Sequence, residues 1–263
     1  MQTFDFRYKL DLYRRKIILT AFIFSFSIIS VFSQARFGEI SKAGQDDKLL
    51  SYGFFLSGHN NYWRLKYSED FLTDRLETNL KSIVPVYTQG FSLGFLANFR
   101  LHDQLNLIFT PKVGFYEFRT EINALYDIDP SLIQVGPDSN LQILDSYTVI
   151  NEATMVEFPL LFKYKAQRFN NSRMFFTAGG SAMFRTKNQE EADIEEIATL
   201  GRDFTIDMGV GFDMYFKYFK FSPEVRFSHG MLDMYREEAT NPFYANQIQS
   251  LRRKSITLYL NFQ

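Results

Sequence analysis

Hydrophobic and polar residues alternate along most of the chain beyond position 90. In the segment Phe91–Arg100 the odd positions are apolar, whereas the even positions are mostly small or polar. A period of two is that of a β-strand with one apolar and one polar face. The same alternation recurs in six later segments and in a shorter first strand, namely 105–115, 154–164, 174–184, 204–216, 219–227, 256–262 and 52–57. The pattern therefore predicts eight strands and an all-β fold.

Two architectures produce this alternation. In a soluble sandwich the apolar faces point inward, whereas in a membrane barrel they point into lipid and the polar faces line the lumen. The predicted strands run to about 10 residues or more, which is the length that a tilted strand needs to cross a membrane. Their apolar faces are rich in Phe and nearly unbroken. These features favour an eight-stranded antiparallel transmembrane β-barrel over residues 51–263.

The predicted connections alternate between short and long. The short ones fall at 101–103, 167–172 and 217–218, and the long ones at 58–89, 121–152, 187–200 and 231–249. Bacterial outer-membrane barrels have short periplasmic turns and long extracellular loops. An even number of strands then places both termini of the chain in the periplasm. Closure also removes sheet edges, whose backbone groups lipid cannot hydrate.

The polar faces of the predicted strands carry charges that would lie inside the barrel. They are Arg100, Lys112, Glu157, Lys163, Asp207, Asp213, Glu224 and Arg226. The interior of an eight-stranded barrel is just wide enough for side chains to fill, and buried charges must pair. We therefore expect a structural network of ion pairs centred on Glu157, Glu224 and Arg226. A path for protons or ions is the alternative.

The first residues have the features of a secretory signal peptide. Arg14, Arg15 and Lys16 precede an apolar run over 17–32, and Ser33-Gln34-Ala35 places small residues where signal peptidase cuts. We expect residues 1–35 to be removed and residues 36–50 to form a periplasmic segment before the barrel. An uncleaved anchor is the alternative, although the run is shorter than the roughly 20 residues that span a bilayer.

The first long connection contains a predicted amphipathic helix over 67–83, with Ser68 as its N-cap. Its apolar residues and a nearby tryptophan are candidates for a docking surface, and the alternative is that they only cap the barrel mouth. These candidates are Trp63, Phe71, Leu72, Leu76 and Leu80. The acidic segment 188–200 is a candidate for a second helix.

Composition excludes several kinds of chemistry. The chain has no Cys, so no thiolate metal site, disulfide or cysteine nucleophile is possible. Its 3 His show no metal-ligand spacing, and a net charge of −1 gives no sign of nucleic-acid binding. No phosphate-binding loop or nucleophile motif occurs. We expect a protein without enzymatic activity, cofactor or small-molecule substrate.

Two prolines fall inside predicted strands. Pro111 and Pro223 lie on apolar faces, and a proline lacks the N–H that a β-ladder needs. Because a closed barrel has no edge strand, we expect a bulge at each position.

Several segments are similar to one family. Tyr62–Leu72, Gly90–Leu101, Leu107–Phe115 with Pro111, and Phe219–Glu224 with Pro223 and Glu224 resemble the PorT (SprT) family of Bacteroidota outer-membrane barrels. The segment Glu157–Lys165, with Pro159, is shared with many related barrels and supports only the wider superfamily. The resemblance covers nearly the whole chain after residue 35.

The resemblance implies a non-enzymatic part in the type IX secretion system. Members of the PorT family are needed to export proteins with a C-terminal secretion signal, and for gliding in species that glide. A filled eight-stranded lumen cannot pass a folded protein, so we expect an accessory or assembly subunit. Its partners would be outer-membrane lipid and other secretion proteins. The alternatives are a stand-alone small porin-like barrel and a surface-binding barrel.

Overall fold

The computed structural model describes residues 46, 48–69, 71, 80–127, 142–186, 197–241 and 245–263. The predicted signal peptide, Leu72, Leu76 and most of the acidic segment 188–200 lie outside these residues. The strands are β1 (Leu50–Tyr67), β2 (Leu80–Val86), β3 (Thr88–Arg100), β4 (Leu105–Phe109), β5 (Lys112–Asp127), β6 (Gln142–Lys165), β7 (Ser172–Arg185), β8 (Arg202–Tyr215), β9 (Lys220–Gly230) and β10 (Ile248–Phe262). Among the described residues, no helix is long and apolar enough to cross a membrane.

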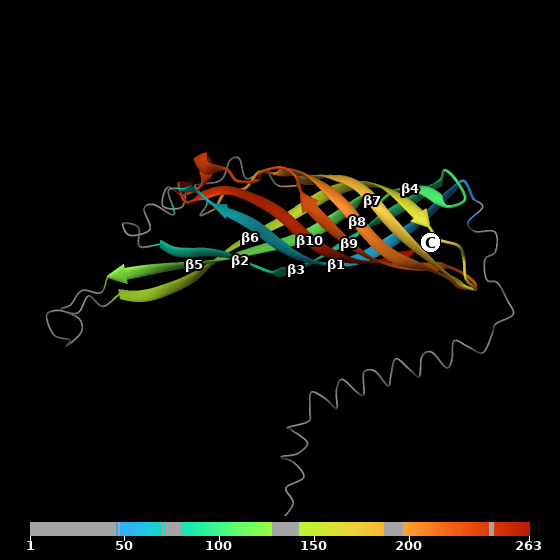
Figure 1. Cartoon of the computed structure of the whole chain (residues 1–263), viewed down its shortest axis with the longest axis horizontal. Helices are drawn as coiled ribbons and strands as arrows, with labels where there is room; N and C mark the ends of the chain where they lie inside the picture. The colour runs from blue at the N-terminus through green and yellow to red at the C-terminus, as the bar shows by residue number, and fades with distance from the viewer. Residues whose placement is uncertain are drawn as a thin grey trace, which may run out of the picture. The chain divides into compact units, whose positions relative to one another are not determined.

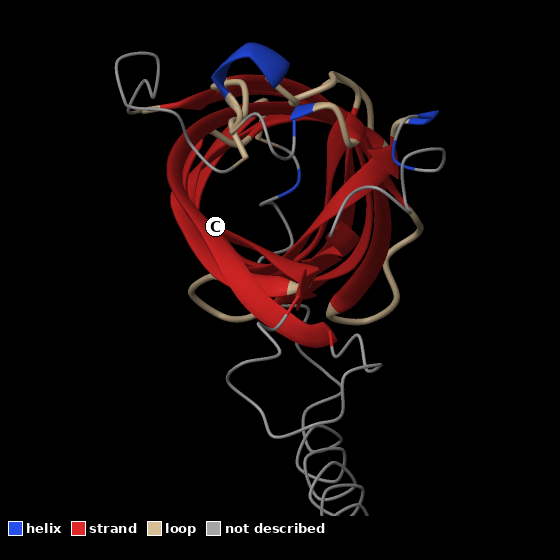
Figure 2. Ribbon diagram, turned by 90° about the vertical axis from the view of Figure 1, so that its left-hand side faces the viewer, coloured by secondary structure: helices blue, strands red, loops and turns tan. Residues whose placement is uncertain are grey.

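The strands close into a ring. β2 and β3 follow one another with only Tyr87 between them, and β4 and β5 are separated by Thr110 and Pro111, so each pair forms one interrupted strand. Every pairing is antiparallel, and β1 is hydrogen-bonded to both β10 and β3. In the described part of the chain, the result is the predicted barrel of eight antiparallel strands (Figure 2).

The two faces of the wall are oriented as predicted. Phe95 has 74% of its surface exposed on the outside, whereas Ser92 on the same strand has 1% exposed. The outer face carries a broad set of exposed apolar side chains, with Phe54, Phe91, Phe158, Phe212 and Phe227 among them. An apolar outer face around a polar interior is the arrangement of a barrel in lipid.

The two ends of the barrel differ (Figure 1). Short connections at 101–104, 166–171 and 216–219 lie at one end, together with the start of β1 and the end of β10. We call this the turn end. The opposite end, here the loop end, carries the longer connections, and β5 and β6 extend beyond their neighbours there. This asymmetry matches the predicted one.

Several strands are longer than the sequence pattern indicates. β1 continues to Tyr67 and β2 begins at Leu80, both inside the predicted loop 58–89, and Leu80–Ile83 is strand rather than helix. β5 and β6 likewise extend into the predicted loop 121–152. Beyond the membrane the outer face no longer needs to be apolar, so the alternation fades while the hydrogen bonds continue. The predicted boundaries were therefore wrong at the loop end.

Neither strand proline produces the expected bulge. The strand assignment stops at Pro111, whose carbonyl accepts a hydrogen bond from the Phe95 amide at 3.1 Å. Phe91 pairs with Phe115 and Ala97 with Phe109 in one register, so no extra residue is inserted at Pro111. The bulge expected at Pro223 is absent, because Leu260 pairs with Pro223 in an unbroken register. The register from β8 to β9 is also the same on either side of Pro223. Pro159 lies within β6, opposite Ser181 of β7.

Candidate functional site: the charged lumen

The centre of the lumen contains a carboxylate with two cationic neighbours. Glu157 of β6 lies 3.1 Å from the Lys112 ammonium and 3.4 Å from the Arg253 guanidinium, and it accepts a hydrogen bond from the Tyr116 hydroxyl. Arg253 also lies 3.7 Å from Asp203. These side chains come from β5, β6, β8 and β10, so the contacts cross the interior of the barrel rather than follow one strand.

An aromatic ring joins this group to a second ion pair. The Lys112 ammonium donates to the Tyr259 hydroxyl at 3.0 Å, and the Arg226 guanidinium lies over the Tyr259 ring at 4.1 Å. Arg226 makes two hydrogen bonds to Glu224, at 3.0 and 3.1 Å, in the fork geometry that favours Arg–carboxylate pairs. Glu157, Lys112, Tyr259, Arg226 and Glu224 therefore form one continuous chain of contacts.

A third group lies nearer the turn end. The Lys163 ammonium is 2.7 Å from Asp213 and lies over the Phe175 ring at 3.6 Å. Asp213 also accepts a hydrogen bond from Ser222 at 2.6 Å.

Asp207 has hydroxyl partners instead of a cation, with Ser181 at 2.7 Å and Thr205 at 3.0 Å. Its charge is thus held by hydrogen bonds without a cation in direct contact among the described residues.

Water is nearly excluded from the ion pairs. Lys112 exposes 4% of its surface, Glu157 2% and Arg226 1%. A water-filled channel along these residues would leave them far more exposed. The side chains therefore fill this part of the lumen, and their mutual contacts offset the cost of removing charge from water.

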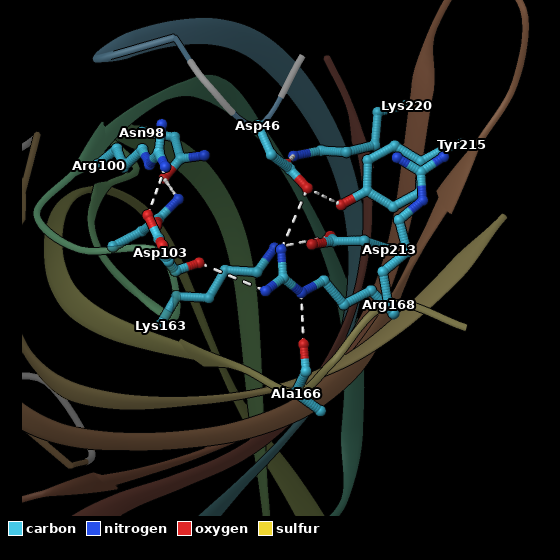
Figure 3. Close-up of polar contacts among 12 residues, drawn as sticks. Asp46, Asn98, Arg100, Asp103, Lys163, Ala166, Arg168, Asp213, Tyr215 and Lys220 are labelled. Atoms are coloured by element: carbon cyan, nitrogen blue, oxygen red, sulfur yellow. Dashed lines mark hydrogen bonds and ion pairs between the residues drawn. The ribbon is translucent and has the colours of Figure 1, made fainter. Parts of the chain in front are cut away.

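The N-terminal segment contributes a carboxylate to the turn end (Figure 3). Asp46 lies 3.2 Å from Arg173 and 3.9 Å from Lys220, and it accepts a hydrogen bond from the Tyr215 hydroxyl. Burial acts to raise the pKa of this carboxyl, but the Tyr215 hydrogen bond and the charges of Lys220 and Lys165 outweigh it and lower the pKa below its usual value. Asp46 thereby joins the residue position just before β1 to the barrel wall.

Arg100 is placed differently from the other predicted network residues. Its side chain is 27% exposed and pairs with Asp103 in the β3–β4 turn. The hydrogen bond from Arg100 and its charge lower the pKa of Asp103. Arg100 therefore stabilises a turn at the rim, and it is not part of the central group.

The candidates for loop docking that the structure describes are buried. Trp63 lies in β1 with 2% exposure and packs its ring 4.2 Å from that of Phe118. Phe71 and Leu80 belong to an apolar cluster that also contains Ile83, Ile122, Val149, Ile197 and Ile248. Ser68 caps the following turn as predicted, since its hydroxyl accepts from the Phe71 amide at 3.3 Å. Trp63, Phe71 and Leu80 therefore help to close the loop end from within, in line with the capping alternative, whereas Leu72 and Leu76 lie outside the described residues.

Some network residues were not singled out from the sequence. Arg253 is the clearest, because it falls between the predicted loop 231–249 and the strand predicted at 256–262. Extending the alternation of Ile256 and Leu258 backward along β10 would have placed it inside the barrel. Asp46 carried no such signal, because its position depends on the path of the segment before β1. Among the described residues, no group of three His, Asp or Glu could hold a metal ion.

Comparison with known proteins identifies the class of barrel. The family model described as outer membrane protein beta-barrel domain matches residues 32–236. Among solved structures, Neisserial surface protein A is similar over 81% of this chain and 98% of its own, with 9% identity and a TM-score of 0.39. OprG of Pseudomonas aeruginosa is similar over 81% and 94%, with 10% identity and a TM-score of 0.38. No match was found among curated proteins.

Proposed function

The chain belongs to the outer membrane protein beta-barrel domain family, and from this premise we propose that it is a non-enzymatic accessory subunit of the type IX protein secretion system. Family membership places the protein in the outer membrane. The finer assignment is supported by the resemblance of Tyr62–Leu72, Gly90–Leu101 and Phe219–Glu224 to PorT proteins. In this role the barrel supports the export of cargo with a C-terminal signal, and gliding in species that glide.

One observation carries the choice of an accessory role over a conduit. The lumen is crossed by the buried contacts from Glu157 through Lys112 and Tyr259 to Arg226 and Glu224. A folded protein cannot pass such an interior, and opening it would separate buried charges from their partners at a cost of several kcal/mol. The barrel therefore acts through its outer surface and its two ends.

Site-specific crosslinking in cells tests the proposal. A photo-crosslinking amino acid is placed at Phe169 or Tyr218, which are 76% and 79% exposed at the turn end. The matched control is Tyr259, which is 1% exposed in the lumen. We expect type IX secretion components to be recovered from the exposed positions and none from Tyr259. Recovery of no secretion component from any exposed position, including further ones at the loop end, would overturn the proposal.

Conductance separates the proposal from a porin-like function. The purified barrel in a planar bilayer should give little or no single-channel current, because side chains fill its lumen. Steady conductance at the level of an open porin would favour the porin-like alternative instead.

A further inference from the structure

Strand β10 divides three consecutive cations between the two faces of the wall. Arg253 points into the lumen and is 1% exposed, whereas Arg252 and Lys254 on either side of it are exposed on the outer face. On the neighbouring strand β1, Arg64 and Lys66 are also exposed on the outer face. Arg64 lies directly opposite Arg252 in the ladder, and Lys254 lies opposite Tyr62. The four cations thus form one outer patch near the loop end, which we call the cation patch.

The charges of the cation patch are not neutralised by direct ion pairs. Within the described part of the chain, none of its four side chains forms an ion pair or side-chain hydrogen bond. The nearby carboxylate of Asp233 accepts hydrogen bonds from the backbone amides of Tyr235 and Leu251. Like charges directly opposite one another on a sheet are destabilising. A bound anion would remove the repulsion between Arg64 and Arg252.

An apolar groove lies beside the patch on the membrane side. It has a volume of about 530 Å³, and Lys254 is part of its lining. Its apolar wall comes from strands β8, β9 and β10 and from two tyrosines whose rings stack at 4.6 Å, so that it is lined by Tyr62, Tyr87, Ile206, Met208, Phe227 and Ile256. Ile256 follows Lys254 by two residues, or about 7 Å along the strand. The groove and the cations therefore adjoin at the edge of the apolar belt.

We propose that the groove and the cation patch bind one phosphorylated glycolipid of the outer leaflet, that is, a lipopolysaccharide. Its phosphate group is bound by Arg64, Arg252 and Lys254, and an acyl chain lies in the groove. The charge of the patch selects an anion, and the planar guanidinium groups match phosphate oxygens in pairs. The loop end faces the cell exterior in bacterial outer-membrane barrels, where lipopolysaccharide forms the leaflet. The site does not depend on the role in secretion.

Equilibrium binding of fluorescent lipid A to the full-length protein in detergent tests this site. The double variant Arg64→Gln/Arg252→Gln should bind lipid A at least about tenfold more weakly than the wild type, because two charge-assisted contacts are lost. The matched control is Lys48→Gln/Lys217→Gln, which removes two exposed cations at the turn end and should leave affinity unchanged. Equal heat-modifiability in gels shows that each variant keeps the closed barrel.

Two further ligands define the chemistry. Lipid A without its phosphates should bind the wild type as weakly as intact lipid A binds the double variant. Phosphatidylglycerol has one phosphate and no sugar, and it should compete poorly. Unchanged lipid A affinity in Arg64→Gln/Arg252→Gln would overturn the site. Equal competition by phosphatidylglycerol would overturn its assignment to a glycolipid.

Discussion

Lys112 and Glu157 are directly opposite one another on β5 and β6, and their charged groups lie 3.1 Å apart inside the barrel. The pair is cross-strand and buried, and Glu157 is also 3.4 Å from Arg253. One carboxylate therefore has two cationic neighbours, and its loss would leave both buried cations without a shared anion.

Replacing Glu157 should destabilise the barrel strongly. Glu157→Gln leaves Lys112 and Arg253 buried without their shared anion, and we expect a loss of about 3–5 kcal/mol in the free energy of unfolding. Urea unfolding in lipid vesicles measures it. The matched control Glu121→Gln changes an exposed carboxylate on the outer face and should cost less than about 1 kcal/mol. An equal effect of the two variants would contradict the network.

Gly209 makes room for the second ion pair. A Cβ at this position would lie 2.6 Å from the Glu224 carboxylate and 2.5 Å from the Thr177 hydroxyl. We expect Gly209→Ala to destabilise by about 1–3 kcal/mol through overpacking. The matched control is Gly58→Ala, where a Cβ meets nothing within 4 Å, and it should be neutral or slightly stabilising. The same unfolding assay compares them, and a neutral Gly209→Ala would mean that the lumen is loosely packed.

The outer face should respond to charge according to depth. Phe95 lies midway along β3 and is 74% exposed, so Phe95→Arg should cost about 2–4 kcal/mol if its side chain meets the middle of the bilayer. Tyr218 lies in the β8–β9 turn near the membrane interface, so Tyr218→Arg should lower the free energy of unfolding by only about 0–1 kcal/mol. Unfolding from vesicles measures both. A larger cost at Tyr218 than at Phe95 would place the membrane elsewhere.

Asp46 should make attachment of the N-terminal segment depend on pH. Its pKa is lowered in the folded protein from an ordinary value of 3.8, so its carboxylate contributes stability above that value and loses it as the pH falls through the folded pKa. We expect Asp46→Asn to be less stable than the wild type at pH 7, with the difference shrinking below about pH 4. Tyr215→Phe removes one donor and should show part of the effect. Identical pH profiles for wild type and Asp46→Asn would exclude this contact.

The fold could largely be predicted from the sequence, because lipid requires an apolar side chain at every outward-facing position that crosses the membrane. Phe91, Leu93 and Phe95 could be assigned to the outside, and Lys112, Glu157 and Arg226 to the lumen, from alternation alone. The rule ends where the strands leave the membrane. Asn60 and Arg64 continue β1 on the outer face without being apolar, and the sequence pattern therefore ended that strand too early.

The contacts within the site were less predictable. Alternation places Lys112 and Glu157 on the same face but not opposite one another, since register across strands depends on the shear of the whole barrel. Trp63 and Phe71 could be recognised as apolar, but their burial depends on the loop end folding over the lumen. Arg64 and Arg252 lie on the first and the last strand. They become neighbours only because the barrel closes and pairs these two strands.

The most direct test of the proposed role in secretion is the extracellular proteome of a deletion strain, with and without complementation by this gene. We expect cargo with the C-terminal secretion signal to accumulate in the periplasm of the deletion strain and to be exported again after complementation. Export that is unchanged by the deletion would contradict the type IX assignment, while leaving the filled outer-membrane barrel intact.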